Sequence, residues 1–166
     1  MARAAGAVTI VTSSSDEKLE YVKSKFGADY GINYKKHPEW SKEALEITNG
    51  EGVDYILENG GSGTIAESIN AVRMGGIISV IGFLSQADPS HMPDVASLAL
   101  GKAAVVRGIT VGSTQLLEEV TRLVGRKGLR LPVEKEFDFS EENVVKAYEY
   151  LASGSHIGKV CIKFAQ

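Results

Sequence analysis

Short β-branched segments alternate with amphipathic segments along the first 131 residues, and this alternation constrains the fold more than any other feature. Residues 8–12 are β-branched throughout, which is typical of a strand buried on both faces of a sheet. Leu19, Val22 and Phe26 then recur at helical spacing, and Gly27 is placed to end that helix. The pattern predicts an α/β fold with a doubly wound parallel sheet.

The segments that follow extend the same alternation, with Asn49-Gly50 and Gly75-Gly76 predicted as turns. Further strands are predicted at residues 29–34, 53–58, 77–81 and 105–111. Helices are predicted to begin at Ser14, at Pro38, at Thr64 (ending near Arg73) and close to Leu116. Past Gly128 the pattern changes to two extended segments, residues 132–139 and 157–164, around an amphipathic helix at 141–151.

The beginning of the chain lacks a motif that such a fold leads one to expect. Residues 1–7 resemble the last turn of a helix closed by Gly6, and no G-x-G-x-x-G occurs in the sequence. We therefore expect the opening strand and the glycine-rich phosphate loop of a dinucleotide-binding unit to be missing. In the strand order 3-2-1-4-5-6 that strand is central, so residues 8–12 and 53–58 would each present a bare edge. The chain is then a fragment, has rearranged strands, or is closed by a partner or a swapped copy.

Composition excludes several classes of protein. With 43% hydrophobic residues the 166-residue chain can form a core, and a net charge of −3 without a basic stripe argues against nucleic acid. The single Cys161 excludes an intramolecular disulfide and a cysteine-rich zinc site. The longest apolar stretch, residues 77–84, is far shorter than the ~20 residues of a membrane span, and no signal peptide is evident. We expect a soluble, cytoplasmic protein with no membrane partner.

A series of short motifs covers nearly the whole chain. They are T-S-S-S-D-E-K at residues 12–18, G-A-D at 27–29, I-N-Y at 32–34, G-V-D at 52–54, N-G-G at 59–61, G-G at 75–76, V-R-G-I-T-V-G-S at 106–113 and G-K-V at 158–160. In this order they resemble the medium-chain dehydrogenase/reductase superfamily, especially its quinone-oxidoreductase-like and zinc-type alcohol-dehydrogenase-like members.

The resemblance implies two parts. Residues 1–131 would be a partial, Rossmann-like dinucleotide-binding domain, and residues 132–166 would be the segment that returns to the catalytic domain. It also implies a homodimer formed through the edge strand at 105–111. Zinc ligands of the zinc-bearing relatives lie upstream of the matched region, and His37, His91 and His156 lack metal-ligand spacing, so we predict no zinc in this chain.

The end of the first strand bears on which nicotinamide cofactor is bound. An NAD enzyme usually places Asp or Glu there, whereas this chain has Thr12 and Ser13, and a carboxylate would repel a 2′-phosphate. By the resemblance, Lys18 and Tyr34 match positions that contact the 2′-phosphate of NADPH, and Ser13 is expected to bind the cofactor at the end of the strand. The alternative makes Ser14 a helix cap and Lys18 a solvated residue. The sequence favours NADP(H) over NAD(H).

Other cofactor contacts are implied by the resemblance at the ends of later strands and near the C-terminus. They are Asn59, Gly60, Gly61, Gly82, Phe83, Val111, Gly112, Ser113, His156 and Lys159. An ordinary tight turn is the alternative for residues 59–61, and a place in the core is the alternative for Phe83 and Leu84. A lone histidine on a loop, such as His156, is more often structural or solvated than catalytic.

No catalytic residue is assigned. Asp54, Glu58 and Glu67 do not form a convincing acid/base pair, and no Ser/His/Asp arrangement is present. The preferred hypothesis is a fragment of an NADP(H)-dependent oxidoreductase that transfers hydride to or from a small-molecule carbonyl, quinone or enone and is inactive alone. The rival is a non-enzymatic, truncated Rossmann-like module that serves binding or oligomerisation. A methyltransferase-like domain is disfavoured because nothing else supports its cofactor site.

Overall fold

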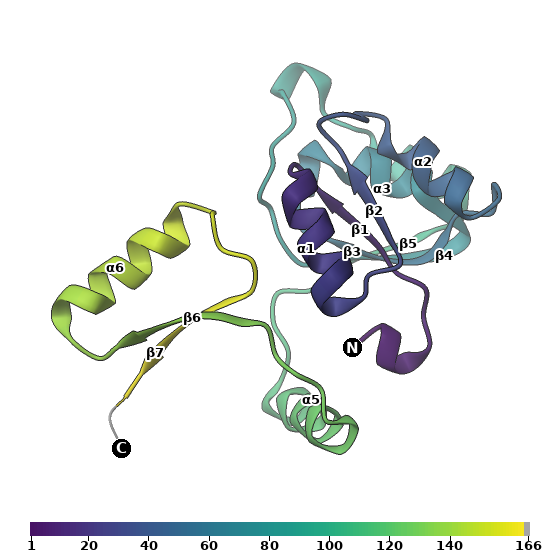
Figure 1. Cartoon of the computed structure of the whole chain (residues 1–166). Coiled ribbons are helices and arrows are strands. Elements are labelled where there is room, and N and C mark those ends of the chain that lie inside the picture. The colour runs from purple at the N-terminus through teal and green to yellow at the C-terminus, as the bar shows by residue number, and fades with distance from the viewer. Residues whose placement is uncertain (165–166) are drawn as a thin grey trace. The chain divides into compact units, whose positions relative to one another are not determined.

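The computed structural model describes residues 1–164, which divide into two compact units (Figure 1). The larger unit is Ala2–Glu118, and the smaller unit begins at Glu119, inside a helix. Each unit has its own parallel strands and its own helices. The domain boundary predicted after residue 131 concerns which domain of a longer enzyme each segment corresponds to, and it stays a prediction.

Strands and helices alternate through the larger unit, as the sequence predicts. In chain order the elements are η1 (Arg3–Ala5), β1 (Ile10–Ser13), α1 (Asp16–Phe26), β2 (Tyr30–Asn33), α2 (Trp40–Ile47), β3 (Val53–Glu58), η2 (Gly61–Gly63), α3 (Ile65–Ala71), β4 (Val72–Val80), η3 (Pro89–His91), α4 (Val95–Lys102), β5 (Val105–Gly108) and α5 (Thr114–Lys127), which runs on past Glu118.

Strands β1 and β2 form a parallel pair with a helix on each face. The backbone of Gly31 lies against Leu19 of α1, whereas its neighbour Ile32 packs in a cluster with Ala44 of α2. Successive residues of a strand point to opposite faces, so α1 and α2 cover opposite faces of this pair. This arrangement is that of a doubly wound sheet.

Strands β3, β4 and β5 form a second parallel sheet, in that order. Its core contains Ile65 and Ile69 of α3 together with Val72 and Ile78 of β4, all buried. Helices α2 and α3 lie side by side in Figure 1, and α3 also packs against α4. The parallel pairing throughout confirms the predicted α/β class.

The two sheets of the larger unit are separate where the sequence predicts a missing central strand. In the described residues β1 is paired with β2 and β3 with β4, and the two groups are not joined through β1 and β3. A doubly wound dinucleotide-binding sheet has the strand order 3-2-1-4-5-6. Without its strand 1, this order becomes two strands, a gap and three strands, which corresponds to β2-β1 and β3-β4-β5 here. The groups nevertheless share a core, because Ile56 of β3 packs on the cluster of Ile32, Ala44 and Ala71.

Several predicted boundaries were wrong in detail. The N-cap of α1 is Ser15, whose hydroxyl accepts from Lys18 N, and not Ser14. Helix α3 ends at Ala71, so β4 begins at Val72 and includes the Gly75-Gly76 pair that was predicted as a turn. Strand β5 ends three residues earlier than predicted, at Gly108.

Helix α4 was not predicted at all. Its residues Val95–Lys102 include Gly101 and are apolar without a clear helical stripe, so the sequence gives little periodicity to detect. The signal at its start is Asp94, whose carboxylate accepts from Ser97 N at 3.1 Å.

The smaller unit confirms the predicted extended–helix–extended pattern. Strands β6 (Val133–Asp138) and β7 (Lys159–Lys163) are parallel, and α6 (Glu141–Ala152) connects them. Gly158 precedes β7 with φ +120°, and a Cβ there would lie 2.3 Å from the Pro132 carbonyl oxygen. Only glycine fits this close approach of two backbone segments.

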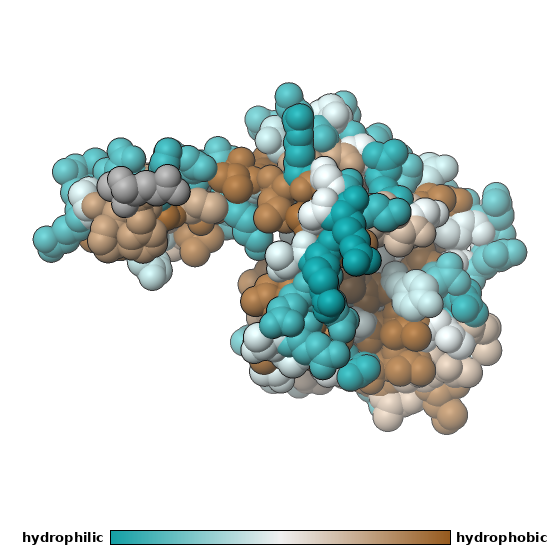
Figure 2. Space-filling view, turned by 90° about the horizontal axis from the view of Figure 1, so that it is seen from below, coloured by the Kyte–Doolittle hydropathy of each residue, from teal (hydrophilic) through white to brown (hydrophobic). Residues whose placement is uncertain are grey.

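Apolar side chains reach the surface of the larger unit, as Figure 2 shows in brown. Tyr55 and Leu57, on one face of β3, are 74% and 76% exposed. Both side chains are apolar and leave this face of β3 accessible to solvent. Among the described residues no helix combines the length and the apolar character needed to cross a membrane.

Candidate functional site

The predicted site residues of the larger unit follow the carboxyl ends of its parallel strands. Ligands of doubly wound sheets bind beyond these ends. β1 ends at Ser13, β3 at Glu58, β4 at Val80 and β5 at Gly108. The turn after β1 and the loops after β3, β4 and β5 therefore form the candidate site, each with its own construction.

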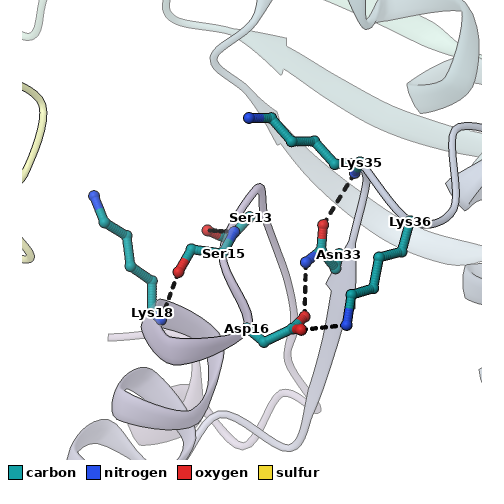
Figure 3. Close-up of polar contacts among 7 residues, drawn as sticks. All are labelled: Ser13, Ser15, Asp16, Lys18, Asn33, Lys35 and Lys36. Carbon is teal, nitrogen blue, oxygen red and sulfur yellow. Dashed lines mark hydrogen bonds and ion pairs between the residues drawn. The ribbon is translucent and has the colours of Figure 1, made fainter.

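The turn after β1 is built from serine hydroxyls and is called here the serine turn, residues 13–15. Ser13 Oγ accepts from Ser15 N at 3.3 Å, and Ser15 Oγ accepts from Lys18 N at 3.3 Å (Figure 3). Tyr34 N donates to the Ser13 carbonyl oxygen at 3.1 Å, which joins the ends of β1 and β2. Side-chain and backbone contacts together fix the conformation of the serine turn.

A carboxylate does lie near the serine turn, but its oxygens are engaged. Asp16 Oδ1 accepts from Asn33 Nδ2 at 2.6 Å, and Asp16 Oδ2 pairs with Lys36 Nζ (Figure 3). The hydrogen bonds from Lys36 and then Asn33 hold the pKa of the Asp16 carboxyl below its ordinary value of 3.8. Asp16 is therefore ionised at neutral pH, and its charge is offset by Lys36.

Two other lysines extend from the same region. In Figure 3 the side chains of Lys18, on α1, and Lys35, after β2, point away from the Asp16–Lys36 pair. Lys35 N donates to Asn33 Oδ1 at 3.0 Å, so Asn33 orients both the Asp16 carboxylate and the backbone that carries Lys35. Tyr34, which lies between Asn33 and Lys35 in the sequence, is 42% exposed. Hydroxyls and ammonium groups of this kind suit a phosphate ligand.

The loop after β3 is held by a buried carboxylate. Glu58 is 3% exposed. Its Oε1 accepts from Gly60 N at 2.6 Å, from Gly61 N at 3.1 Å and from Thr64 Oγ1 at 2.6 Å, while Oε2 accepts from Ser68 Oγ. The backbone donors of Gly60 and Gly61 are thus directed at Glu58 rather than outward.

The loop after β4 pairs with the loop after β3 beyond the end of the sheet. Leu84 N donates to the Asn59 carbonyl oxygen at 3.1 Å, and Ser85 N to that of Gly60 at 2.7 Å. Gly63 N returns a bond to the Ser85 carbonyl oxygen at 3.2 Å. Asn59, Gly60, Gly61, Gly82 and Phe83 are therefore brought together in one paired structure.

Glycines at this pairing are required by contacts within the protein. Gly61 has φ +82°, and a Cβ on it would lie 2.5 Å from the Phe83 ring. A Cβ on Gly82 would lie 2.2 Å from Asn59 Oδ1. Phe83 covers Gly61 yet is 61% exposed, and Leu84 is 82% exposed, so neither is a core residue here and that alternative was wrong.

The loop after β5 leads into α5. Ser113 caps this helix, because its Oγ accepts from Leu116 N at 3.3 Å and its carbonyl oxygen from Leu117 N at 3.1 Å. Val111 is 82% exposed. Ile109 N bonds to the Val80 carbonyl oxygen at 2.9 Å, which places the start of this loop beside the end of β4.

His156 and Lys159 belong to the smaller unit. The His156 ring meets the Tyr150 ring edge-on, with centroids 6.5 Å apart. Tyr150 Oη donates to Glu134 Oε1 at 2.7 Å, and this bond raises the pKa of the tyrosine hydroxyl. Lys159 N donates to the Pro132 carbonyl oxygen at 2.6 Å as β7 begins.

The remaining acidic candidates are separated and structurally engaged. Asp54 pairs with Arg73 at 2.5 Å, and Glu67 accepts from Ser41 N at 3.0 Å. In the part of the chain that the structure describes, no three His, Cys, Asp or Glu side chains cluster as metal ligands do. A zinc ion therefore does not fit the described residues, and the absence of zinc stays a prediction.

The fold and the loops define a parallel α/β domain of the dinucleotide-binding type. Residues 1–126 match the family model described as zinc-binding dehydrogenase. The chain belongs to this family, which confirms the resemblance drawn from the motifs.

Individual proteins agree with this assignment. Over 163 residues the chain is 42% identical to a zinc-type alcohol dehydrogenase-like protein of Schizosaccharomyces pombe, covering 98% of this chain and 46% of that protein. It is 27% identical to an NADP-dependent oxidoreductase of Cochliobolus heterostrophus, covering 99% of this chain and 49% of the relative. The chain thus spans about half the length of the curated relatives it matches.

Solved structures match over the same share. An alcohol dehydrogenase structure from Sinorhizobium meliloti superposes with a TM-score of 0.84 at 38% identity, covering 98% of this chain and 46% of that one. A structure described as an NAD-dependent alcohol dehydrogenase also gives 0.84, at 27% identity, covering 99% and 46%. Relatives of both nicotinamide preferences are therefore similar to this chain.

Proposed function

We propose that this chain is the greater part of the cofactor-binding domain of an NADP(H)-dependent oxidoreductase that transfers hydride to or from a carbonyl, quinone or enone. The observation that carries the cofactor preference is the serine turn. Its hydroxyls follow β1 directly, and the nearest carboxylate, Asp16, is engaged by Asn33 and Lys36. The serine turn therefore lacks a carboxylate that is able to accept hydrogen bonds from both ribose hydroxyls of NAD.

The positive groups around the serine turn supply the complementary argument. A 2′-phosphate needs hydroxyl or ammonium donors. Ser13 lies in the turn itself, and Lys18 and Lys35 lie on the segments that adjoin it. The name of the Cochliobolus relative states NADP dependence, whereas one similar structure is described as NAD-dependent. The choice of NADP(H) therefore rests on the serine turn and not on the relatives.

When bound, the nicotinamide group supplies the hydride. The residues of this chain would bind and orient it. Ser13, Lys18 and Tyr34 would hold the adenosine phosphate end. Residues 59–63, which include Asn59, Gly60 and Gly61, would form a fixed wall beside the ribose and nicotinamide. Gly82 and Phe83 on the loop after β4, and Val111, Gly112 and Ser113 on the loop after β5, would supply further contacts.

Because the Gly60 and Gly61 N–H groups are bonded to Glu58, the wall after β3 would contact the nucleotide through Cα surface and side chains. It would not bind the pyrophosphate through these amides. The phosphate-binding task falls to another part of the enzyme, in keeping with a chain that spans about half of its relatives. We propose accordingly that the chain alone has little or no activity.

A non-enzymatic binding or oligomerisation module is the second candidate. The break between β1 and β3 and the exposed Tyr55 and Leu57 favour it, because they offer surfaces to another chain. A homodimer through β5 suits either candidate. This strand is at the edge of its three-stranded sheet, and Val105 is 51% exposed. Sedimentation is expected to give a dimer, and a monomer would count against this pairing.

Titration with NADPH and NADH, followed by nucleotide fluorescence, tests the proposal directly. NADPH is expected to bind more tightly, and raising the salt concentration should weaken NADPH binding more than NADH binding. Tighter NADH binding would overturn the cofactor assignment. No measurable binding of either nucleotide would favour the non-enzymatic module.

A further inference from the structure

We propose that Glu58 is a positioning residue that fixes the conformation of residues 59–63, the wall that the proposed function places beside the nucleotide. Glu58 ends β3 and is 3% exposed, although a carboxylate strongly prefers water. A buried carboxylate persists only where hydrogen bonds replace the lost solvent.

The bonds that Glu58 accepts divide between its two oxygens. Oε1 accepts from Gly60 N, Gly61 N and Thr64 Oγ1, all of which belong to or follow the wall. Oε2 accepts from Ser68 Oγ, inside α3. Oε1 therefore holds the backbone of the wall, and Oε2 anchors the carboxylate to α3.

The four hydrogen-bond donors around Glu58 match the acceptors of its carboxylate in number. A carboxylate has only acceptors, with about four lone-pair sites, which matches two N–H and two O–H donors. Ile81 N donates to the Glu58 carbonyl oxygen at 2.9 Å, so the backbone of Glu58 is fixed to the loop after β4 as well. Glu58 thus connects α3, the wall and the loop that carries Phe83.

The connection extends to Phe83 through Gly61. Gly61 has φ +82°, a conformation in which its N–H donates to Glu58 Oε1 and in which a Cβ would lie 2.5 Å from the Phe83 ring. Without the carboxylate, the Gly61 N–H loses its hydrogen bond, and both the backbone of Gly61 and the position of the Phe83 ring can change. Glu58 would act on the nucleotide through these groups and not by touching it.

The test compares four variants of the full chain. Glu58→Gln keeps an acceptor of the same length, and Glu58→Asp keeps the charge but is one methylene shorter. Glu58→Met keeps the length but removes both acceptors. Ser68→Ala is the matched control, because it removes a bond to the same carboxylate on the oxygen that faces away from the wall.

The first readout is amide exchange at Gly60 and Gly61, which does not depend on nucleotide. We expect exchange to accelerate about tenfold or more in Glu58→Asp and Glu58→Met, and to change less than about threefold in Glu58→Gln and Ser68→Ala. If Glu58→Met does not fold, the Asp and Gln variants still decide. Unchanged exchange in Glu58→Asp would overturn the proposal.

The second readout is NADPH affinity by fluorescence, with thermal unfolding measured beside it. The Asp and Met variants should bind NADPH about tenfold more weakly, and the Gln variant should restore most of the affinity. A purely structural role would lower the unfolding temperature of Ser68→Ala and Glu58→Asp alike and leave their affinities equal, which would also overturn it. If the unaltered chain binds no nucleotide, the proposed function fails, while amide exchange still decides whether Glu58 orders the wall.

Discussion

The serine turn and the wall after β3 lie at the same edge of a parallel fold but are constructed in opposite ways. The serine turn presents side chains, and its charged neighbours Asp16 and Lys36 are 57% and 63% exposed. The wall presents backbone, with glycine donors directed inward at a buried carboxylate. The nucleotide preference of the serine turn can therefore be altered by adding or removing a single charge, whereas binding at the wall depends on its backbone conformation.

This difference sets the expected size of mutational effects. Interactions between exposed charges are screened by solvent, and each contributes roughly 0–1 kcal/mol. A substitution in backbone held at positive φ against a packed ring has a larger effect, because the protein must accommodate both the backbone strain and the steric contact. Substitutions in the wall should therefore affect folding and binding together, and those at the serine turn should affect nucleotide preference more than folding.

The largest effect is expected from Gly61→Ala. The added Cβ would meet the Phe83 ring at 2.5 Å, and φ +82° is unfavourable for alanine. We expect a loss of about 2–3 kcal/mol in the free energy of unfolding, measured with urea, together with weaker NADPH binding.

Gly112→Ala is the matched control for Gly61→Ala. The nearest atoms to a Cβ on Gly112 are those of Leu116, at 3.6 and 3.7 Å, so this substitution should change stability by less than about 0.5 kcal/mol. Equal effects of the two substitutions would contradict the distinction between the wall and the loop after β5.

Ser13→Asp should reverse the nucleotide preference without unfolding the protein. The new carboxylate would lie at the end of β1, where it repels a 2′-phosphate and can accept from ribose hydroxyls. We expect NADPH to bind more than about tenfold more weakly and NADH to bind as well or better.

Ser24→Asp, in the last turn of α1, introduces the same charge away from the serine turn and controls for net charge. It should weaken NADPH binding by less than about twofold, because separated surface charges are screened. A selective loss of NADPH binding in this control would show that net charge, and not the serine turn, sets the preference.

Removing the ammonium groups one at a time should have smaller effects. Lys18→Ala and Lys35→Ala are each expected to weaken NADPH binding by about three- to tenfold and to leave NADH binding unchanged. Lys42→Ala is the control, since Lys42 pairs with Glu39 at 2.7 Å on α2. If Lys35→Ala behaves like Lys42→Ala while Lys18→Ala does not, the phosphate contact is confined to α1.

The two regions also differ in how well the sequence predicts them. The serine turn is local, since Ser13, Ser15 and Lys18 are close in sequence and their hydrogen bonds span two or three residues. The motif was therefore recognisable, apart from the choice of Ser14 as the cap. Lys35 was missed because its relation to the turn depends on the pairing of β1 with β2.

The wall depends on contacts that sequence patterns do not reveal. Glu58 was considered only as half of an acid/base pair, because its partners Thr64 and Ser68 lie six and ten residues away. An acidic residue that closes an otherwise apolar strand and precedes Asn59-Gly60-Gly61 was the available signal. The parallel α/β class was predictable from the alternation alone, since parallel strands follow from strand–helix–strand repeats.

The smallest effect, and the most specific for the serine turn, is expected from Asp16→Asn. Hydrogen bonds from Lys36 and Asn33 lower the pKa of Asp16 in the folded state, so its ionised form stabilises the fold above pH 3.8 and this stabilisation is lost as the pH falls through the lowered pKa. The urea-unfolding curves of the unaltered chain and Asp16→Asn should therefore differ at pH 7 and approach each other below about pH 3.8.

The Asp16–Lys36 pair also predicts a change in nucleotide binding of the opposite sign to that in stability. Loss of the Asp16 charge leaves Lys36 without its carboxylate, so NADPH should bind about two- to threefold more tightly to Asp16→Asn, with NADH unchanged. Lys36→Met supplies the test of cause. In that background Asp16→Asn should have a reduced effect on stability, because the paired charge is already gone. An undiminished effect would assign the lowered pKa to Asn33 instead, and Lys36 would then be available to the phosphate in the unaltered chain.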